Sequence, residues 1–407
     1  MPRFCIIKEI MKRNELKYAC LFGGGAIRGL AHVGVVRAMK ELGIGLGTLA
    51  GSSVGALVAA FLAVGYDDNE LEKIFLDVDF ELFRDINFSK TVALSKGQIF
   101  LEWMREVIES KFYGEDYVKG KNPRVTFKDI DKNLVIITTD LTNFTCKEFS
   151  RLTTPDFEVA EAVRISACMP GLMRPVEFED CMLVDGDLQK SRPMWELCET
   201  LANLEENVLE VRLEGTPCGN LSNPISFINS VYSCVTSVAS DFVVNLFKND
   251  EKHDCLIVNT GDVVIVNFQM KEAERKELIQ NGYKQTVEHF KYLLPAKKQK
   301  HLDNYIKIKN FAIDIRDLIL KDKVAAAQAK FGRLLALLCE IRFEIDANIY
   351  SEILSFSDDI LCNTGATIFL KHVYLKDVRK VLKKLDTLEE LAKSKQNYLS
   401  NLLEALK

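Results

Sequence analysis

Short apolar runs alternate with helical patterns over the first 290 residues of the chain. The runs at residues 18–22 and 46–50 lead into glycine- or serine-rich turns, and apolar residues at helical spacing follow at residues 31–42 and 56–64. An apolar run, a turn and a helical period in this order predict a strand, a turn and a helix. The run at residues 134–138 is almost wholly apolar, which is typical of a strand buried on both faces.

Further apolar runs extend this pattern toward residue 290. Strands that alternate with helices favour a mostly parallel sheet that helices cover on both faces. We therefore expect an α/β fold, a three-layer sandwich with a mostly parallel central sheet. The additional strands are expected at residues 182–184, 208–213, 255–259 and 263–268.

Beyond residue 290 the pattern becomes almost wholly helical, and the charge changes with it. Residues 291–407 hold 21 Lys and Arg against 15 Asp and Glu, although the whole chain has a formal net charge of −5. We place a domain boundary near Leu294 and Pro295, which gives an α/β domain at residues 15–294 and a helical C-terminal domain of unknown role at residues 295–407. Its helices are expected at residues 302–320, 324–343, 349–361 and 367–385.

The composition is that of an ordinary globular protein, with 407 residues, 48% of them hydrophobic and 27% charged. Disorder and rod-like folds are thereby excluded for the chain as a whole. The 11 cysteines form an odd set without a two-residue spacing, so neither a zinc site nor a disulfide framework is predicted. We expect no metal and no organic cofactor, and a reducing, cytoplasmic location. The longest nearly uncharged run, residues 51–66, is too short to cross a bilayer.

A Gly51-x-Ser53-x-Gly55 motif lies between a predicted strand and a predicted helix. A nucleophilic serine needs a tight, strained turn that exposes its hydroxyl, and glycines two residues before and after it leave room for the neighbouring backbone. The start of a helix adds free N–H groups and the positive end of the dipole. The alternative is an ordinary turn, because patterns of five residues occur by chance.

A glycine-rich turn at residues 23–29 also joins a predicted strand to a predicted helix, and it carries Arg28. Successive N–H groups of such a turn suit a phosphate or the oxyanion of an acyl-transfer intermediate. The glycines do not fit the register of a dinucleotide-binding turn, and no Lys followed by Ser or Thr forms a P-loop. The oxyanion interpretation is therefore favoured over the nucleotide interpretation.

A carboxylate, Asp185, ends the predicted strand at residues 182–184 and is followed by Gly186. Asp-Gly is a common pair in tight turns, so this motif alone predicts only a turn. Beside a nucleophilic serine, however, a carboxylate could serve as the base that accepts the hydroxyl proton.

Taken together, the three motifs resemble the patatin-like phospholipases in order and spacing. The resemblance covers about residues 15 to 290 and includes Asp185-Gly186 followed by Pro193. Other matching stretches lie at residues 24–36, 137–141 and 162–171.

The resemblance implies a lipid acyl hydrolase with a Ser-Asp dyad and without a catalytic histidine. Ser53 falls on the nucleophile, Asp185 on the base, and Gly24, Gly25 and Arg28 on the oxyanion turn. The implied reaction cleaves fatty-acyl esters of phospholipids or lysophospholipids through an acyl-Ser53 intermediate. The residues that bind the rest of the lipid are not identified by the motifs.

Two positions depart from the family pattern. Ala26 replaces a glycine in the turn, which could change the N–H groups that face the oxyanion. Asp187 places a second carboxylate two residues after Asp185. An ordinary aspartate is a poor base at pH 7, and burial or a neighbouring like charge would raise its pKa toward the working range. We therefore expect Asp187→Asn to shift the pH profile.

Two other functions stay open at this point. One is a Ser-His-Asp esterase that uses one of the five histidines, and the other is a non-catalytic lipid- or partner-binding protein on the same fold. Intact Ser53 and Asp185 argue against the second alternative. The candidate histidines are His32, His253, His289, His301 and His372.

The expected partners are an acyl-lipid substrate and a membrane surface. Residues 367–385 combine apolar residues at helical spacing with six Lys and Arg, so this helix could lie on an anionic surface. The alternative is a packed helix with a solvated basic face. Basic and aromatic residues are not interleaved along strands, so no nucleic-acid partner is expected. The sequence leaves the oligomeric state undetermined.

Overall fold

The computed structural model describes residues 16–78, 95–189, 192–215, 227, 230–232, 234, 253–263, 270–341, 346–355 and 371–405. The described residues up to His289 form one compact unit, and those from Phe290 onward form a second. No helix in these ranges is both long and apolar enough to span a lipid bilayer.

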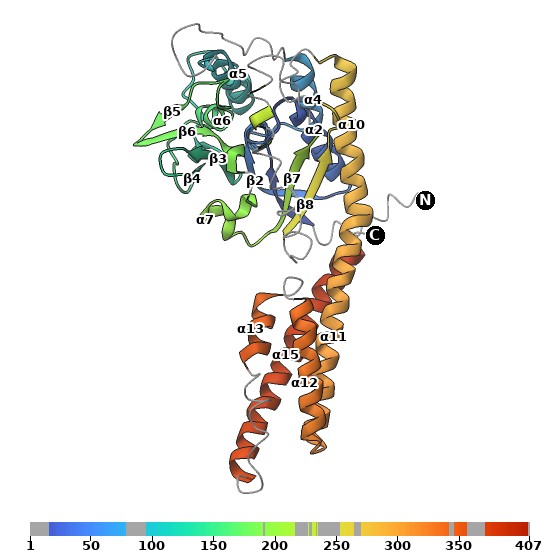
Figure 1. The fold of residues 1–407 in the computed structure, drawn as a ribbon. Helices are drawn as coiled ribbons and strands as arrows, with labels where there is room; N and C mark the ends of the chain where they lie inside the picture. Colours follow the sequence, from blue (N-terminus) through green and yellow to red (C-terminus); the bar gives the residue numbers. More distant parts are fainter. Residues whose placement is uncertain are drawn as a thin grey trace. The chain divides into compact units, whose positions relative to one another are not determined.

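The first unit is built on an eight-stranded mixed sheet with the order β5-β6-β3-β2-β1-β7-β8, and β4 pairs with β3 (Figure 1). The pairs formed by β1, β2, β3, β7 and β8 are parallel, whereas β4, β5 and β6 join by antiparallel pairs. The expected α/β fold with a mostly parallel sheet is confirmed. The strands are β1 (Lys17–Phe22), β2 (Gly45–Ser52), β3 (Leu134–Asp140), β4 (Thr145–Ser150), β5 (Val176–Phe178), β6 (Cys181–Asp185), β7 (Asn207–Glu214) and β8 (His253–Asn259).

Two of these strands were not predicted. β4 and β5 are short and carry polar residues, so neither has the apolar run that marks the other strands. The strand expected at residues 263–268 lies, except for Val263, outside the described residues.

Helices pack around this sheet (Figure 1). Every residue of α3 is buried, which explains the long uncharged run that contains it. The helices of this unit are η1 (Ala26–Gly29), α2 (Leu30–Glu41), α3 (Val54–Ala63), α4 (Asp68–Asp77), α5 (Gln98–Tyr113), η3 (Gly114–Asp116), η4 (Phe127–Asp129), α6 (Val159–Ser166), η5 (Gly186–Gln189), η6 (Met194–Glu196), α7 (Glu199–Ala202) and α10 (Glu272–Glu288).

Two glycines let α2 and α10 approach each other closely. A Cβ atom on Gly34 of α2 would lie 1.9 Å from the carbonyl oxygen of Ile279, and one on Gly282 of α10 would lie 2.0 Å from that of Ala31. No side chain fits at such a distance, so both positions require glycine for packing rather than for a turn.

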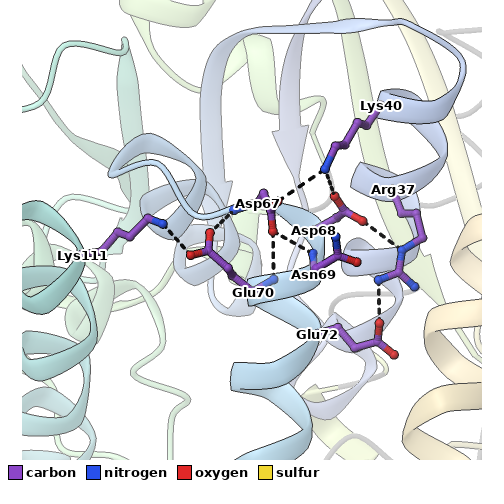
Figure 2. A network of polar contacts seen from close by, with 8 residues as sticks. All are labelled: Arg37, Lys40, Asp67, Asp68, Asn69, Glu70, Glu72 and Lys111. Carbon is purple, nitrogen blue, oxygen red and sulfur yellow. Dashed lines mark hydrogen bonds and ion pairs between the residues drawn. The ribbon is translucent and has the colours of Figure 1, made fainter. Parts of the chain in front are cut away.

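A network of charged groups joins α2 to α4 (Figure 2). Arg37 donates to Asp68 over 3.0 Å, and Lys40 donates to the same carboxylate over 2.5 Å. Burial acts to raise the pKa of Asp68, but the hydrogen bonds and charges of Lys40 and Arg37 outweigh it and leave the pKa below its ordinary value. Asp67 caps α4 by accepting the N–H groups of Asn69 and Glu70. The start of α4 is thus fixed on α2.

The second unit is helical, as expected. Its helices are α11 (Leu294–Leu320), α12 (Val324–Glu340), α13 (Ala347–Ser355) and α15 (Lys371–Ala405), and a π-helical turn, η7 (His289–Leu293), precedes α11. Three of the expected helices run partly outside the described residues, at positions 342–343, 356–361 and 367–370.

The helix expected at residues 367–385 is the first half of a longer one, α15, which packs against α11. Val381, Leu385 and Leu388 are buried, while Arg379 and Lys380 are exposed. The side chains of residues 371–378 are outside the description. In the described part, α15 is therefore a packed helix with a solvated basic face, because its apolar residues are covered by protein.

Candidate active site

The proposed nucleophile and base meet along one edge of β3. The last residue of β2, Ser52, pairs with Ile137, and the last residue of β6, Asp185, pairs with Thr138. Because β4 lines the other edge of β3 over both positions, β2 and β6 must share one edge and run toward each other. The structure thereby brings Ser53, which follows β2, next to Asp185.

Ser53 occupies a sharp, strained turn at the start of α3. Its φ of 52° and ψ of −127° lie outside the regions that side-chain-bearing residues favour. A Cβ atom on Gly51 would lie 2.3 Å from the backbone of Gly55, and one on Gly55 would lie 1.9 Å from the carbonyl oxygen of Phe22. Both glycines of the motif are thus required by backbone contacts, as a nucleophile elbow demands.

Ser166, at the end of α6, holds the backbone of this turn. Its hydroxyl accepts the N–H of Ser53 over 2.9 Å and donates to the carbonyl oxygen of Ile137 over 2.6 Å. Ser166 is fully buried. One side chain therefore ties the strained elbow to β3 beside the point where the two strands meet.

We expect Ser166→Ala to impair the elbow. The variant leaves the buried N–H of Ser53 without its acceptor, which costs about 1–3 kcal/mol, and misplacement of the nucleophile should lower kcat on the order of tenfold to hundredfold. Thermal unfolding and steady-state hydrolysis of a soluble ester measure the two effects. Ser110→Ala is the control, because the hydroxyl of Ser110 donates to Val107 within α5 and interacts with Tyr66, neither of which belongs to the elbow. Wild-type kcat in Ser166→Ala would contradict the role assigned to Ser166.

Asp185 is a fully buried carboxylate with defined partners. Its Oδ1 atom accepts the N–H of Asp187 over 2.8 Å and the hydroxyl of Tyr232 over 3.0 Å. Its Oδ2 atom is buried and makes no hydrogen bond of standard geometry among the described residues. The Ser53 hydroxyl lies near enough to favour the charged form of this carboxylate. One oxygen is thus held in place, and the other is left for the proton of a nucleophile.

Burial raises the pKa of Asp185 to about 7, and the charge of Asp187 acts in the same direction. The hydrogen bonds from Asp187, Ser53 and Tyr232 offset these two causes only in part. A base is most efficient when its pKa lies near the working pH. The environment of Asp185 therefore suits a general base at neutral pH.

Tyr232 was missed by the sequence analysis. It is buried in a cluster with Met169, against which Leu172 and Leu188 pack, and its hydroxyl donates to Asp185. Burial and the charges of the two aspartates raise the pKa of Tyr232 well above its ordinary value, so the phenol stays a donor. No motif surrounds it in the sequence, and no local signal could have identified it.

The glycine-rich turn adjoins the dyad, but one predicted donor is already engaged. The N–H of Gly24 donates to Asp187 Oδ1 over 2.9 Å, so it is not free for an oxyanion. Within the described residues, the N–H groups of Gly25 and Ala26 donate to no protein acceptor. Gly25 has a φ of 155° and Ala26 a φ of 48°. Ala26 thus keeps the turn conformation at a cost of roughly 1–2 kcal/mol. The N–H groups available to an oxyanion are those of Gly25 and Ala26.

Arg28 binds to segments outside the dyad. Its Nε donates to the carbonyl oxygen of Val263 over 2.8 Å, and its guanidinium lies against Gly215. Burial lowers its pKa below the ordinary value. Arg28 makes no hydrogen bond to Ser53 or Asp185 among the described residues, so it anchors η1 to the segments that follow β7 and β8.

None of the hydrogen bonds of Ser53 or Asp185 within the described ranges involves a histidine. His32 instead donates from Nε2 to the carbonyl oxygen of Gly23 over 2.7 Å and supports the glycine-rich turn. His253 stacks on Trp195. His289 and His301 are buried elsewhere, and the side chain of His372 lies outside the description. The geometry therefore favours a serine-carboxylate pair over a histidine triad.

Comparison with known proteins gives a match to the family model for patatin-like phospholipase over residues 21–197. This match confirms the resemblance expected from the motifs. It runs from the end of β1 past β6 and thus contains Ser53, Asp185 and the glycine-rich turn.

Three relatives and a solved structure illustrate what the chain is similar to. An uncharacterised protein of Acanthamoeba polyphaga mimivirus is 27% identical over 295 residues, which are 67% of this chain and 93% of that protein. Lysophospholipase NTE1 of Scheffersomyces stipitis is 27% identical over 183 residues, 44% of this chain and 10% of that protein. A probable lipid hydrolase of Invertebrate iridescent virus 6 is 25% identical over 180 residues, 43% of this chain and 61% of that protein. The crystal structure of VipD from Legionella pneumophila aligns with a TM-score of 0.48 at 16% identity, covering 96% of this chain and 90% of VipD.

Proposed function

Since residues 21–197 belong to the patatin-like phospholipase family, we propose that the protein hydrolyses fatty-acyl esters of phospholipids or lysophospholipids through an acyl-Ser53 intermediate, with Asp185 as the base. The observation that carries this proposal is the buried carboxylate of Asp185, whose pKa is raised to about 7, beside a serine held in a strained turn. A hydroxyl is a weak nucleophile until a neighbouring base accepts its proton.

In the proposed first half-reaction, Ser53 Oγ attacks the carbonyl carbon of the ester and its proton passes to Asp185 Oδ2. The N–H groups of Gly25 and Ala26 donate to the resulting oxyanion, the kind of interaction that lowers the barrier most in acyl transfer. The tetrahedral intermediate then collapses, the bond to the alcohol oxygen breaks, and Asp185 returns the proton to that oxygen. The alcohol leaves and the acyl group stays on Ser53.

In the second half-reaction, water attacks the acyl carbonyl and gives a proton to Asp185. The new tetrahedral intermediate collapses, the bond to Ser53 Oγ breaks, and the proton returns to Ser53. The fatty acid leaves and the free enzyme is restored. Tyr232, through its hydrogen bond to Asp185 Oδ1, keeps the carboxylate oriented in both halves.

The similarity to a lysophospholipase and to a probable lipid hydrolase supports acyl lipids as substrates. We propose that the protein meets them in the cytoplasm, at a membrane surface. The head group and the acyl position that it prefers are part of what the following experiment measures.

The test is fatty-acid release from a panel of phospholipids, lysophospholipids and neutral acyl lipids, before and after treatment with a fluorophosphonate. We expect release that the reagent abolishes, with the reagent attached to Ser53 in peptide mass spectra, because fluorophosphonates react with activated serines. A protein that releases no fatty acid and takes up no reagent would contradict the proposed function. Attachment to a different serine would contradict the assignment of the nucleophile.

A further inference from the structure

The side chain of Asp187 connects three segments of the site. Its Oδ1 atom accepts the N–H of Gly24 from the glycine-rich turn and, over 2.5 Å, the hydroxyl of Ser52 from the elbow. Its own N–H donates to Asp185 at the end of β6. Asp187 is 2% exposed. A single buried residue therefore contacts the backbone that carries the nucleophile, the oxyanion donors and the base.

The turn and Asp187 fit each other closely. A Cβ atom on Gly24 would lie 2.4–2.5 Å from the carboxylate atoms of Asp187. Only glycine can stand at this position while Asp187 is in place, so the carboxylate fills the space in front of the Gly24 N–H.

We propose that Asp187 is a positioning residue of the acyl-transfer site: its carboxylate fixes the glycine-rich turn and the elbow on β6, so that the N–H groups of Gly25 and Ala26, and not that of Gly24, face the oxyanion. The inference rests on the proposed function, because it assigns parts within the same site. Charge-assisted hydrogen bonds of this kind are about twice as strong as neutral ones, which suits a fixed tie between segments.

The negative charge of Asp187 also acts on the base. Among the described residues Asp187 forms no ion pair, and the groups that contact its carboxylate are the neutral Gly24 and Ser52. The ionisable groups near it are Asp185, whose pKa its charge helps to raise, and Tyr232. Arg28, on the neighbouring η1, hydrogen-bonds to Val263 instead. The charge therefore strengthens Asp185 as a proton acceptor.

Asp187→Asn tests the negative charge of Asp187 separately from its hydrogen bonds. Asparagine keeps an oxygen that can accept from Gly24 and Ser52, but it removes the like charge beside Asp185. Because the active form of Asp185 is the deprotonated one, a lower pKa extends activity to lower pH. We expect the acid limb of kcat/KM, measured on a soluble ester, to move down by about one pH unit. The plateau should fall because the base is weaker.

Asp187→Ala and Ser52→Ala test the geometric part. We expect Asp187→Ala to lower kcat by on the order of tenfold to hundredfold, with a smaller change in KM, because the turn and the elbow lose their tie. If Asp187→Ala does not fold, Ser52→Ala provides the test: it removes one hydrogen bond, keeps the charge, and should lower kcat without moving the pH midpoint.

Asp180→Asn is the matched control, since Asp180 is exposed and should leave both the midpoint and kcat unchanged. An unshifted midpoint in Asp187→Asn, or wild-type kcat in the folded geometric variants, would overturn the inference. A wild-type protein that neither hydrolyses the ester nor reacts with a fluorophosphonate would instead overturn the proposed function. The two failures are therefore distinct.

Discussion

Ser53→Ala is expected to lower ester hydrolysis by more than about 10⁴-fold, because removal of the nucleophile leaves only binding and oxyanion stabilisation. The change deletes one oxygen atom and keeps the side-chain carbon that the strained turn already tolerates at a φ of 52°. The unfolding temperature should stay close to that of the wild type. The measurement is single-turnover release of fatty acid, together with fluorophosphonate labelling.

The companion measurement is lipid binding by the same variant. Ser53→Ala should bind vesicles of its preferred substrate as the wild type does, since the deleted hydroxyl belongs to a residue that is only 5% exposed. Turnover above about one hundredth of the wild-type rate would mean that another group is the nucleophile, and the Ser-Asp mechanism would be wrong.

Asp185→Asn is expected to lower kcat by on the order of 10²- to 10⁴-fold, the usual contribution of a general base. Asparagine has nearly the same shape and can still accept the hydrogen bonds from Asp187 and Tyr232, but it cannot take a proton from Ser53. The wild-type rate should rise with pH through an inflection near the Asp185 pKa of about 7. The variant should lack this inflection in its residual rate.

The same substitution should stabilise the fold above neutral pH. The native pKa of Asp185 lies above the unfolded value near 3.9. Between these two values the native state holds a proton that the unfolded state has lost, so the stability of the wild type falls as pH rises through this window. The asparagine side chain carries no charge to bury, and the unfolding free energy of Asp185→Asn should exceed that of the wild type at pH 8. A less stable and fully active variant would contradict the role of Asp185.

The sequence predicts the fold best where one local pattern determines a turn together with the strand and helix on either side of it. The strand, turn and helix around Gly51, Ser53 and Gly55 are confirmed, because glycine is needed there for close backbone contacts, at Gly51 with Gly55 and at Gly55 with β1. The buried run in β3 was recognised for a similar reason, since a strand covered on both faces needs apolar residues throughout. The helical second unit followed from a sustained helical period.

The missed features depend on contacts between distant segments. The antiparallel direction of β6 is not encoded in its five residues, yet it determines how Asp185 meets Ser53. The loss of Gly24 as a free donor depends on Asp187, which local spacing cannot place in front of its N–H. Tyr232 comes from a segment without a motif. The roles of Ser53 and Asp185 stay predictions, which the variants above test.

Strands β2 and β6 approach each other from opposite directions along one edge of β3. The position of the reactive pair therefore does not depend on the parts of the chain that select the substrate. The distance between hydroxyl and carboxylate is set by two adjacent residues, Ile137 and Thr138. The exposed turns at residues 119–121 and 151–153 can lengthen or shorten without changing that distance, because neither contributes to the shared edge. Engineering of acyl-chain or head-group preference should therefore begin in exposed turns such as these, where insertions leave the reactive pair undisturbed.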